Sequence, residues 1–332
     1  MDKKKYIIMI SVLVLILGVV TTILIIKGPS NLTNEEDKKY GEEHKKYSNT
    51  FNLKFINDGD DAHYVIEGLT TYGSNELTIE IPDTIDGYKV TKLISYKDFS
   101  DFSKVETIKI GKNISFIGTK DEEGLGNNIF MSAFKLKKII VDAKNEVYSS
   151  IDDVLYNKDK SILIKYPLNN SNTNITIRTG VVTIYEDAFN NNAVIEKVYF
   201  PSTLKIIKDR SFNNCKNLST IEFNNVINLK EIGDFAFSKC SSLSVVKLPN
   251  GIETIGNNAF ANCYAKNTKE SFIELFIPSS VINFGERICY NTSNNPSFVL
   301  TTVSDNLDNL KKYYENFNID SDDINEKIKI SK

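Results

Sequence analysis

The sequence predicts a solenoid, a fold in which short and similar coils stack on one another. The phrase I-G-x-x-A-F-x-x-C occurs at residues 232–240 and again at residues 255–263. Apolar residues between the two copies follow at spacings of three and two, and the whole pattern returns after about 23 residues. One such unit cannot bury its own apolar residues, whereas stacked units can. The repetition therefore predicts a β-rich, right-handed coil of short stacked strands with turns and short helical segments.

Each predicted coil has two parts. The piece before a proline, as in V-Y-F-P at residues 198–201, alternates its side chains with period two and predicts a short strand. The proline ends strand pairing and turns the chain. The I-G-x-x-A-F-x-x-C piece is too short for a stable helix, so it predicts a turn with a short helical or irregular segment. The phenylalanines that start this column in four coils are Phe189, Phe212, Phe237 and Phe260.

The N-terminus carries a basic stretch at residues 3–5 and then an apolar run at residues 6–26. A helix of about 20 residues spans a bilayer core, and basic residues before it favour a cytoplasmic N-terminus. Residues 1–27 are therefore predicted to form a transmembrane signal anchor, with a helix over about residues 6–26 in the lipid bilayer. A cleaved signal peptide is the alternative, although no small-residue cleavage site ends the run.

Three further segments follow the predicted anchor. Residues 28–50 are charged, show no apolar period and predict a stalk or linker. Residues 51–303 are the predicted extracellular repeat domain. Residues 304–332 are predicted to form a helical cap over the last coil and a frayed tail, with a partner-binding helix as the alternative. The apolar residues on one face of that helix are Leu307, Leu310, Tyr314 and Phe317.

The pattern I-G-x-x-A-F-x-x-C-x-x-L-x-x-V-x-L-P-x-x-I-x-x-I resembles the BspA-type leucine-rich repeats of bacterial surface proteins. Residues 64–93 look like the opening unit of that family, and residues 151–167 look like its recurrent D-x-V-L-Y…L-I-x-Y-P insert. The resemblance covers about residues 52–303, and it fails at residues 119–135 and at Cys289, which occupies the Phe column. It implies a leucine-rich-repeat-like solenoid, surface exposure, adhesion or protein recognition, and no catalytic residues.

Motifs for catalysis, metal binding and nucleic-acid binding are missing from the sequence. His44 and His63 are the only histidines, and His44 falls in the predicted stalk, so a Ser-His-Asp or Cys-His set has little to build on. The aspartates at residues 58–61 predict a turn rather than a calcium loop. A net charge of −3 argues against nucleic acid. The sequence therefore predicts no enzyme, no cofactor, no metal site and no small-molecule substrate.

Three of the cysteines, Cys215, Cys240 and Cys263, occupy one column of the repeat. Coils about 4.8 Å apart would place their Cα atoms within the range of a disulfide. Stacked side chains point in parallel, however, which suits a row of buried free thiols better. The sequence favours free thiols and leaves the disulfide open.

A candidate binding face follows from the strand pattern, because the residue between two inward positions points outward. We expect these outward residues to line one continuous sheet, and such faces of solenoids are used for binding. The candidate residues are Glu80, Lys109, Ile140, Thr176, Tyr199, Glu222, Lys247 and Phe276. Tyr199 and Phe276 are aromatic, a type enriched in binding hot spots. A merely solvated face is the alternative.

Taken together, these features predict a membrane-anchored, extracellular, non-catalytic module that recognises a protein or a glycan. The alternative is a structural or assembly component of the cell envelope that packs on another envelope protein. A cell-wall hydrolase is disfavoured, because it needs paired acids in a cleft and the repeat leaves few residues with which to build one.

Overall fold

The computed structural model describes the chain in several ranges, and it divides into two compact units. The described ranges are 15–16, 19–20, 40–95, 102–119, 128–263, 273–289, 298–302, 307–308, 310–311 and 328–330. The first unit is Met1–Gly41 and the second is Glu42–Lys332.

In the first unit, strands β1 (Leu15–Ile16) and β2 (Val19–Val20) form an antiparallel pair. These four residues fall within the predicted helix over residues 6–26, and the structure describes them as extended. Ile16, Val19 and Val20 are β-branched, and such side chains favour an extended backbone. The rest of the predicted helix over residues 6–26 lies outside the described residues. Within the described part of the chain, every helix is too short or too polar to cross a bilayer.

The second unit starts with a small cap on the solenoid. Helix α1 (Glu42–Tyr47) contacts two strands of this unit, β3 and β6. Four strands then pair in the order β3-β4-β7-β6, and β9 adds to β7. They are β3 (Phe51–Ile56), β4 (His63–Leu69), β6 (Thr84–Ile85), β7 (Tyr88–Ser95) and β9 (Phe116–Thr119). Two 3-10 turns, η1 (Gly59–Asp61) and η2 (Gly73–Asn75), join them. Residues 42–50, expected in the stalk, therefore lie in the same compact unit as the repeats.

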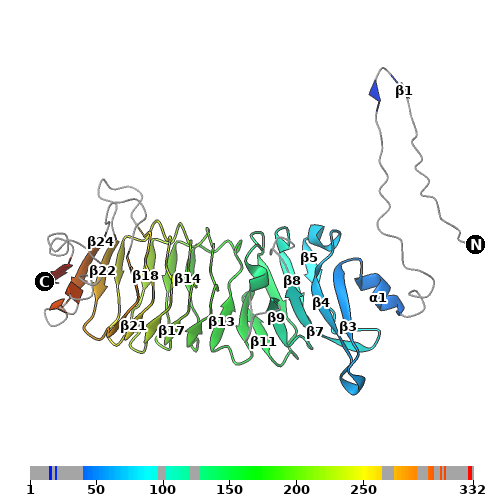
Figure 1. Cartoon of the computed structure of the whole chain (residues 1–332), viewed down its shortest axis with the longest axis horizontal. Helices are drawn as coiled ribbons and strands as arrows, with labels where there is room; N and C mark the ends of the chain where they lie inside the picture. The colour runs from blue at the N-terminus through cyan, green and yellow to red at the C-terminus, as the bar shows by residue number, and fades with distance from the viewer. Residues whose placement is uncertain are drawn as a thin grey trace, which may run out of the picture. The chain divides into compact units, whose positions relative to one another are not determined.

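Beyond the cap, the predicted solenoid is confirmed, with strands of successive coils side by side along the stack (Figure 1). One side of each coil supplies strands to three parallel sheets, ordered β10-β8-β5, β14-β16-β18 and β20-β22-β24-β25. The first two comprise β5 (Thr78–Glu80), β8 (Thr107–Ile110), β10 (Lys138–Val141), β14 (Asn174–Thr176), β16 (Lys197–Tyr199) and β18 (Thr220–Glu222). The third comprises β20 (Val245–Lys247), β22 (Ile273–Ile277), β24 (Phe298–Thr302) and β25 (Ile328–Ile330).

A second side of the coils forms one eight-stranded sheet that runs through most of the stack. A hairpin insert begins it, and the Ile before each glycine of the repeat continues it. Its strands are β11 (Tyr148–Ile151), β12 (Val154–Asn157), β13 (Ile162–Lys165), β15 (Thr183–Ile184), β17 (Ile206–Ile207), β19 (Glu231–Ile232), β21 (Thr254–Ile255) and β23 (Asn283–Phe284). The 3-10 turn η4 (Asn128–Phe130) precedes the insert.

The third side, which carries the I-G-x-x-A-F-x-x-C phrase, consists of turns. Residues 166–263 contain no helix, so the irregular alternative is correct there. Backbone amides of one coil bond to the next coil, as from Phe212 N to Ala236 O (2.8 Å) and from Phe237 N to Ala259 O (2.7 Å). Since these amides point along the stack, they cannot make helical bonds within the coil. A left-handed residue opens the segment in five coils: Asp187, Arg210, Phe235, Asn258 and Arg287.

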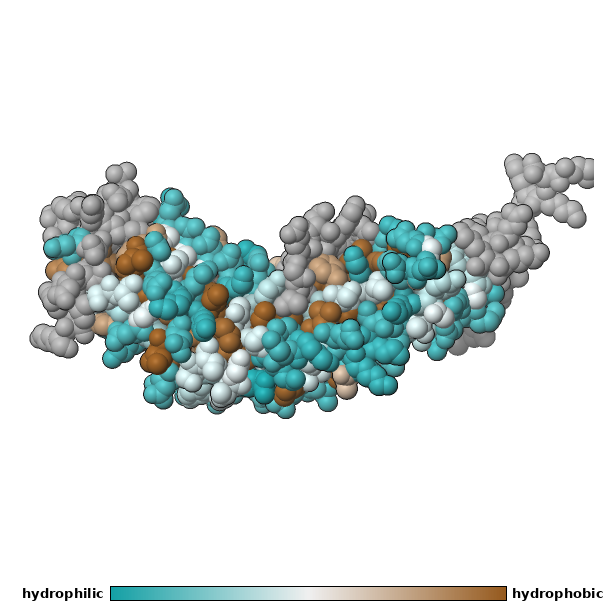
Figure 2. Space-filling model, turned by 90° about the horizontal axis from the view of Figure 1, so that it is seen from below, coloured by the Kyte–Doolittle hydropathy of each residue, from teal (hydrophilic) through white to brown (hydrophobic). Residues whose placement is uncertain are grey.

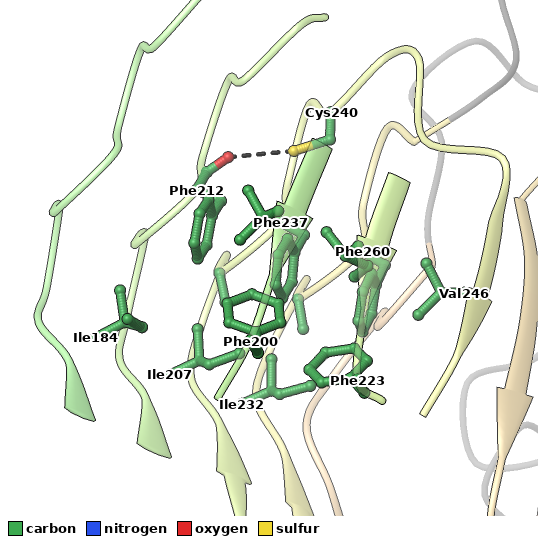
Figure 3. Packing of buried hydrophobic residues seen from close by; sticks show 14 of the residues in the cluster. Ile184, Phe200, Ile207, Phe212, Phe223, Ile232, Phe237, Cys240, Val246 and Phe260 are labelled. Atoms are coloured by element: carbon green, nitrogen blue, oxygen red, sulfur yellow. Dashed lines mark hydrogen bonds between the residues drawn. The ribbon is translucent and has the colours of Figure 1, made fainter. Parts of the chain in front are cut away.

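Stacked aromatic rings form the centre of the core. The ring centroids of Tyr166, Phe189, Phe212, Phe237 and Phe260 follow one another at 4.9, 4.6, 5.1 and 5.3 Å. In Figure 3 three of these rings stand in a row above the isoleucines of the eight-stranded sheet. The four phenylalanines are fully buried. The prediction that the Phe column is core is confirmed.

The cysteines are free, buried thiols. Each thiol of the column donates a hydrogen bond to a phenylalanine carbonyl of the preceding coil, as from Cys240 Sγ to Phe212 O at 3.1 Å (Figure 3). The equivalent distances are 3.2 Å for Cys215 and 3.0 Å for Cys263. Burial, followed by hydrogen bonds with the neighbouring thiols, raises the pKa of Cys240 well above its usual value. A thiol held in the neutral form is a poor nucleophile, so Cys240 has a structural role.

A second ladder fixes the glycine of each I-G pair. Asp234 Oδ1 accepts a hydrogen bond from Asn257 N (2.7 Å), and Asn257 Oδ1 accepts one from Glu286 N (2.6 Å). The side chain of one coil therefore lies against the glycine of the next. A Cβ atom built on Gly256 would lie 2.5 Å from Asp234 N and from Asp234 Oδ1. At Gly256 the residue is glycine because a side chain does not fit against Asp234.

The hairpin β12–β13 joins two hydrophobic cores. Leu155 and Ile164 belong to the N-terminal core, whereas Val154, Tyr156 and Leu163 belong to the core of the C-terminal coils. Successive side chains of a strand point to opposite faces, so both faces of this hairpin are covered. The repeats therefore pack around two hydrophobic cores that meet at the hairpin.

Lys165, at the end of β13, is a fully buried lysine. Its Nζ donates a hydrogen bond to the backbone carbonyl of Asp187 at 2.8 Å. Burial lowers the pKa of Lys165 from 10.5 to about 8, although Asp187 opposes the shift. Burying the charged ammonium form of a lysine costs more free energy than burying the neutral amine.

Lys165 gives a stability prediction with a definite sign. Because the pKa is lower in the folded protein, the unfolded chain binds more protons between pH 8 and 10.5, and stability rises with pH there. Urea unfolding should show a gain of about 1–2 kcal/mol from pH 7.5 to 9.5 that Lys165→Met lacks. Parallel stability curves for the two proteins would contradict the burial argument. The range stays below pH 10, because tyrosines with raised pKa values, such as Tyr156, act in the opposite direction above it.

The C-terminal segment differs in part from the expectation. The described residues 307–308 and 310–311 are helical, and Leu310 is fully buried against the core, as a cap requires. The tail expected to fray contains β25, which pairs parallel with β24. Its I-K-I sequence alternates with period two and continues the sheet, so residues 328–330 are better placed in a strand than in solution. The other residues after 311 lie outside the described range.

Candidate binding surface

The eight candidate residues all lie on the outer strands, and neighbouring members are in register. Glu80 pairs with Lys109, and Lys109 pairs with Ile140. Thr176 pairs with Tyr199, which in turn pairs with Glu222. Lys247 pairs with Phe276. Glu222 and Phe276 are partly buried, and the other six are exposed. Their outward placement agrees with the sequence pattern, and we call this set the strand column.

The strand column is not carried by one continuous sheet, which corrects the expectation. Its members fall in three sheets, and the continuous eight-stranded sheet lies on another side of the coils. The first interruption comes from the hairpin insert, where Ile139 N bonds to Asp153 O (3.0 Å) rather than to the next coil. The second falls between β18 and β20, where the intervening coil carries an insertion around Ile227. The column therefore consists of three separate patches.

In the first patch the two charged members of the strand column form an ion pair with each other. Lys109 Nζ lies 2.9 Å from Glu80 Oε2, across neighbouring strands. Both side chains are solvent-exposed, so the pair contributes little to stability. A partner would have to compete with this ion pair for either charge. Ile140, 41% exposed, is the apolar member of the patch.

The second patch centres on Tyr199. Its side chain is 38% exposed, and Thr176 and Glu222 flank it in register. Lys197, on the same strand, also faces outward. The ring thus sits among hydroxyl, carboxylate and ammonium groups without an ion pair between the flanking residues. Among the described members, Tyr199 has the best combination of apolar area and polar neighbours for contact with a partner.

The third patch combines a cation–π contact with an exposed valine. Lys247 Nζ lies 5.8 Å from the ring centroid of Phe276. Val245, 60% exposed and two residues before Lys247, was not among the predicted residues. Period-two alternation places residues i and i+2 on one face, so the same pattern could have found it. The third patch therefore presents more apolar surface than the predicted residues alone.

The described surface presents exposed apolar side chains in separate places. Among the residues that the structure describes, no three His, Cys, Asp or Glu side chains are grouped as metal ligands. On the face shown in Figure 2, hydrophobic side chains form separate patches in a mostly hydrophilic surface. Two strongly exposed apolar residues, Ile227 (73%) and Ile282 (72%), lie away from the strand column. Such a surface suits recognition through a few anchoring side chains.

Comparison with known families identifies the repeats. Residues 161–295 match the family model described as "BspA type Leucine rich repeat region" in six copies. Residues 161–295 therefore carry repeats of the BspA type. The match confirms the resemblance read from the motif, over a shorter stretch than the coverage of about residues 52–303 expected from it.

Solved structures of bacterial leucine-rich repeat proteins are similar to the chain at low identity. A leucine-rich cell surface protein from Faecalibacterium prausnitzii is 20% identical, with a TM-score of 0.41, over 74% of this chain and 94% of that one. The pneumococcal vaccine antigen PcpA is 17% identical, with a TM-score of 0.46, over 71% of this chain and 76% of that one. These values carry no conclusion about function. No curated protein sequence matches the chain.

Proposed function

We propose that the BspA-type repeat region is a non-catalytic binding module that recognises a protein or a glycan outside the cell. The observation that carries this proposal is the strand column, in which outward side chains of successive coils are held in register. An in-register column on a rigid stack presents its side chains with little loss of conformational entropy on binding. Tyr199 is the proposed central contact, supported by Ile140, Val245 and Phe276.

Membrane attachment is a separate part of the proposal. The apolar run at residues 6–26 and the basic residues before it support an anchor with a cytoplasmic N-terminus. Such an anchor would hold the repeats at the outer surface of the membrane, where they can meet an extracellular partner.

A capture experiment tests the binding function. The full chain, held in detergent micelles, serves as bait for host surface extract and for the envelope extract of the producing cell. Tyr199→Ser and Val245→Ser should each reduce capture of the partner by about tenfold or more, because truncating a central contact costs at least about 1.4 kcal/mol. Ile227→Ser and Ile282→Ser are matched controls, since they remove similarly exposed side chains outside the column.

The outcomes separate the two functions that the sequence allows. Capture of a host component that is lost with Tyr199→Ser supports recognition through the strand column. Capture of envelope components alone, unchanged by either column variant, supports a structural role in the envelope. Equal losses in the column variants and the two controls would contradict a binding site at the column.

A further inference from the structure

Helix α1 (Glu42–Tyr47) is attached to the cap by few contacts. None of its residues is buried, and a helix of this length does not persist alone in water. A reciprocal pair of hydrogen bonds joins Glu43 to the turn between β6 and β7: Glu43 N donates to Asp86 Oδ1 (3.2 Å), and Asp86 N donates to Glu43 Oε2 (2.6 Å). Docking of α1 therefore depends on a small number of polar and ring contacts.

His44 makes one of these contacts. Its Nδ1 is hydrogen-bonded to the hydroxyl oxygen of the buried Tyr64, at 3.1 Å. The centroids of the two rings are 5.6 Å apart. Tyr64 belongs to an aromatic cluster with Phe55 and Tyr88, at centroid distances of 5.1 and 6.5 Å. The imidazole is therefore partly buried beside these rings, and a charge on it is disfavoured there.

We propose that α1 is a pH-sensitive strap, docked on the cap at neutral pH and released when His44 is protonated. Release frees residues 42–47 from Asp86 and Tyr64, uncovers the aromatic cluster, and lengthens the connection that precedes β3. The strap is independent of the proposed binding function, because α1 touches the cap and not the strand column.

The charged groups around His44 set the sign of the effect. Burial lowers the pKa of His44 from 6.5, and Asp86 partly opposes this. Glu43 also attracts a proton to the ring, whereas Lys45 and Lys46 on the same helix repel it. The undocked segment therefore binds a proton more tightly, and docking weakens as pH falls below 6.5.

A single fluorophore can report the position of the strap in the full chain. The protein has no tryptophan, so Tyr47→Trp places a unique indole beside Phe51, where the natural rings are 6.4 Å apart. The emission maximum should shift to longer wavelength between pH 7.5 and 5.0. In the same background His44→Gln, which keeps a hydrogen-bonding side chain without titrating, should show no shift over this pH range.

Hydrogen exchange of the natural sequence provides the second measurement. After correction for the intrinsic pH dependence, exchange at residues 42–48 should rise severalfold from pH 7.5 to 5.5, while β16 and β18 stay protected. Equal fluorescence shifts in the parent and the His44→Gln protein would overturn the proposal. A fluorescence shift without faster exchange would also overturn it, because the ring would then titrate on a docked helix.

Discussion

Phe237→Ala is expected to lower the free energy of unfolding by about 3–5 kcal/mol, the largest loss of any substitution considered. The Phe237 ring is fully buried and lies 5.1 Å from the ring of Phe212 and 5.3 Å from that of Phe260. Alanine would leave a cavity between two coils and break the ring stack on both sides. The backbone on the third side is held by bonds between coils, so it cannot easily collapse to fill the space.

Urea unfolding followed by circular dichroism would measure this loss. Tyr199→Ala is the matched control, because it removes an aromatic ring from the outside of the same stack and should change stability by about 0.5 kcal/mol or less. Equal losses for the two variants would show that the ring stack does not hold the coils together.

Gly256→Ala is expected to cost about 2–3 kcal/mol, from the addition of a single methyl group. The new Cβ would lie 2.5 Å from the backbone nitrogen of Asp234 and from the backbone carbon of Gly233. Backbone atoms cannot rotate away as a side chain does. The coils would have to separate, and the hydrogen bond from Asn257 N to Asp234 Oδ1 would lengthen.

The position equivalent to Gly256 in an earlier coil provides a control for Gly256→Ala. Lys208 occupies the position of Gly256 in an earlier coil, since Lys208 N bonds to Ile184 O as Gly256 N bonds to Ile232 O. A Cβ is therefore already tolerated there, and Lys208→Ala should leave the thermal midpoint nearly unchanged. A midpoint for Gly256→Ala that matches the one for Lys208→Ala would refute the steric argument.

The periodic part of the fold could be predicted from the sequence because each column obeys one constraint. Phe189, Phe212 and Phe237 recur because every coil presents the same inward position to its neighbours, and all of them are buried. The outward positions follow from the same alternation, so the strand column lies on the strands that the pattern indicated. The period of the sequence repeat does not indicate which partner the strand column binds.

Features that depend on the contact of one region with another could not be predicted in this way. Alternation marks Lys165 only as a charged residue at a strand end, and its burial results from a hairpin that lies between two cores. The sequence E-E-H-K-K-Y of α1 has the composition of a solvated linker. It docks because Asp86 and Tyr64, distant in the sequence, provide partners for Glu43 and His44.

The breaks in the outer sheet also arise from insertions rather than from the repeat. The hairpin insert resembles a family motif, yet the motif does not say that Ile139 will bond to Asp153 instead of to the next coil. The tail strand β25 was missed for a related reason. Its I-K-I triplet is too short to indicate a strand until the edge of β24 is known to be next to it.

The hairpin β12–β13 also affects how local unfolding spreads along the stack of coils. Coils of a solenoid contact only their neighbours, so local unfolding can advance one coil at a time. Unfolding of the hairpin exposes Leu155 from one core and Leu163 from the other at the same time, so it costs more than unfolding of a single coil. Proteolysis that starts among the C-terminal coils should therefore slow at this joint and leave the N-terminal core as a folded fragment.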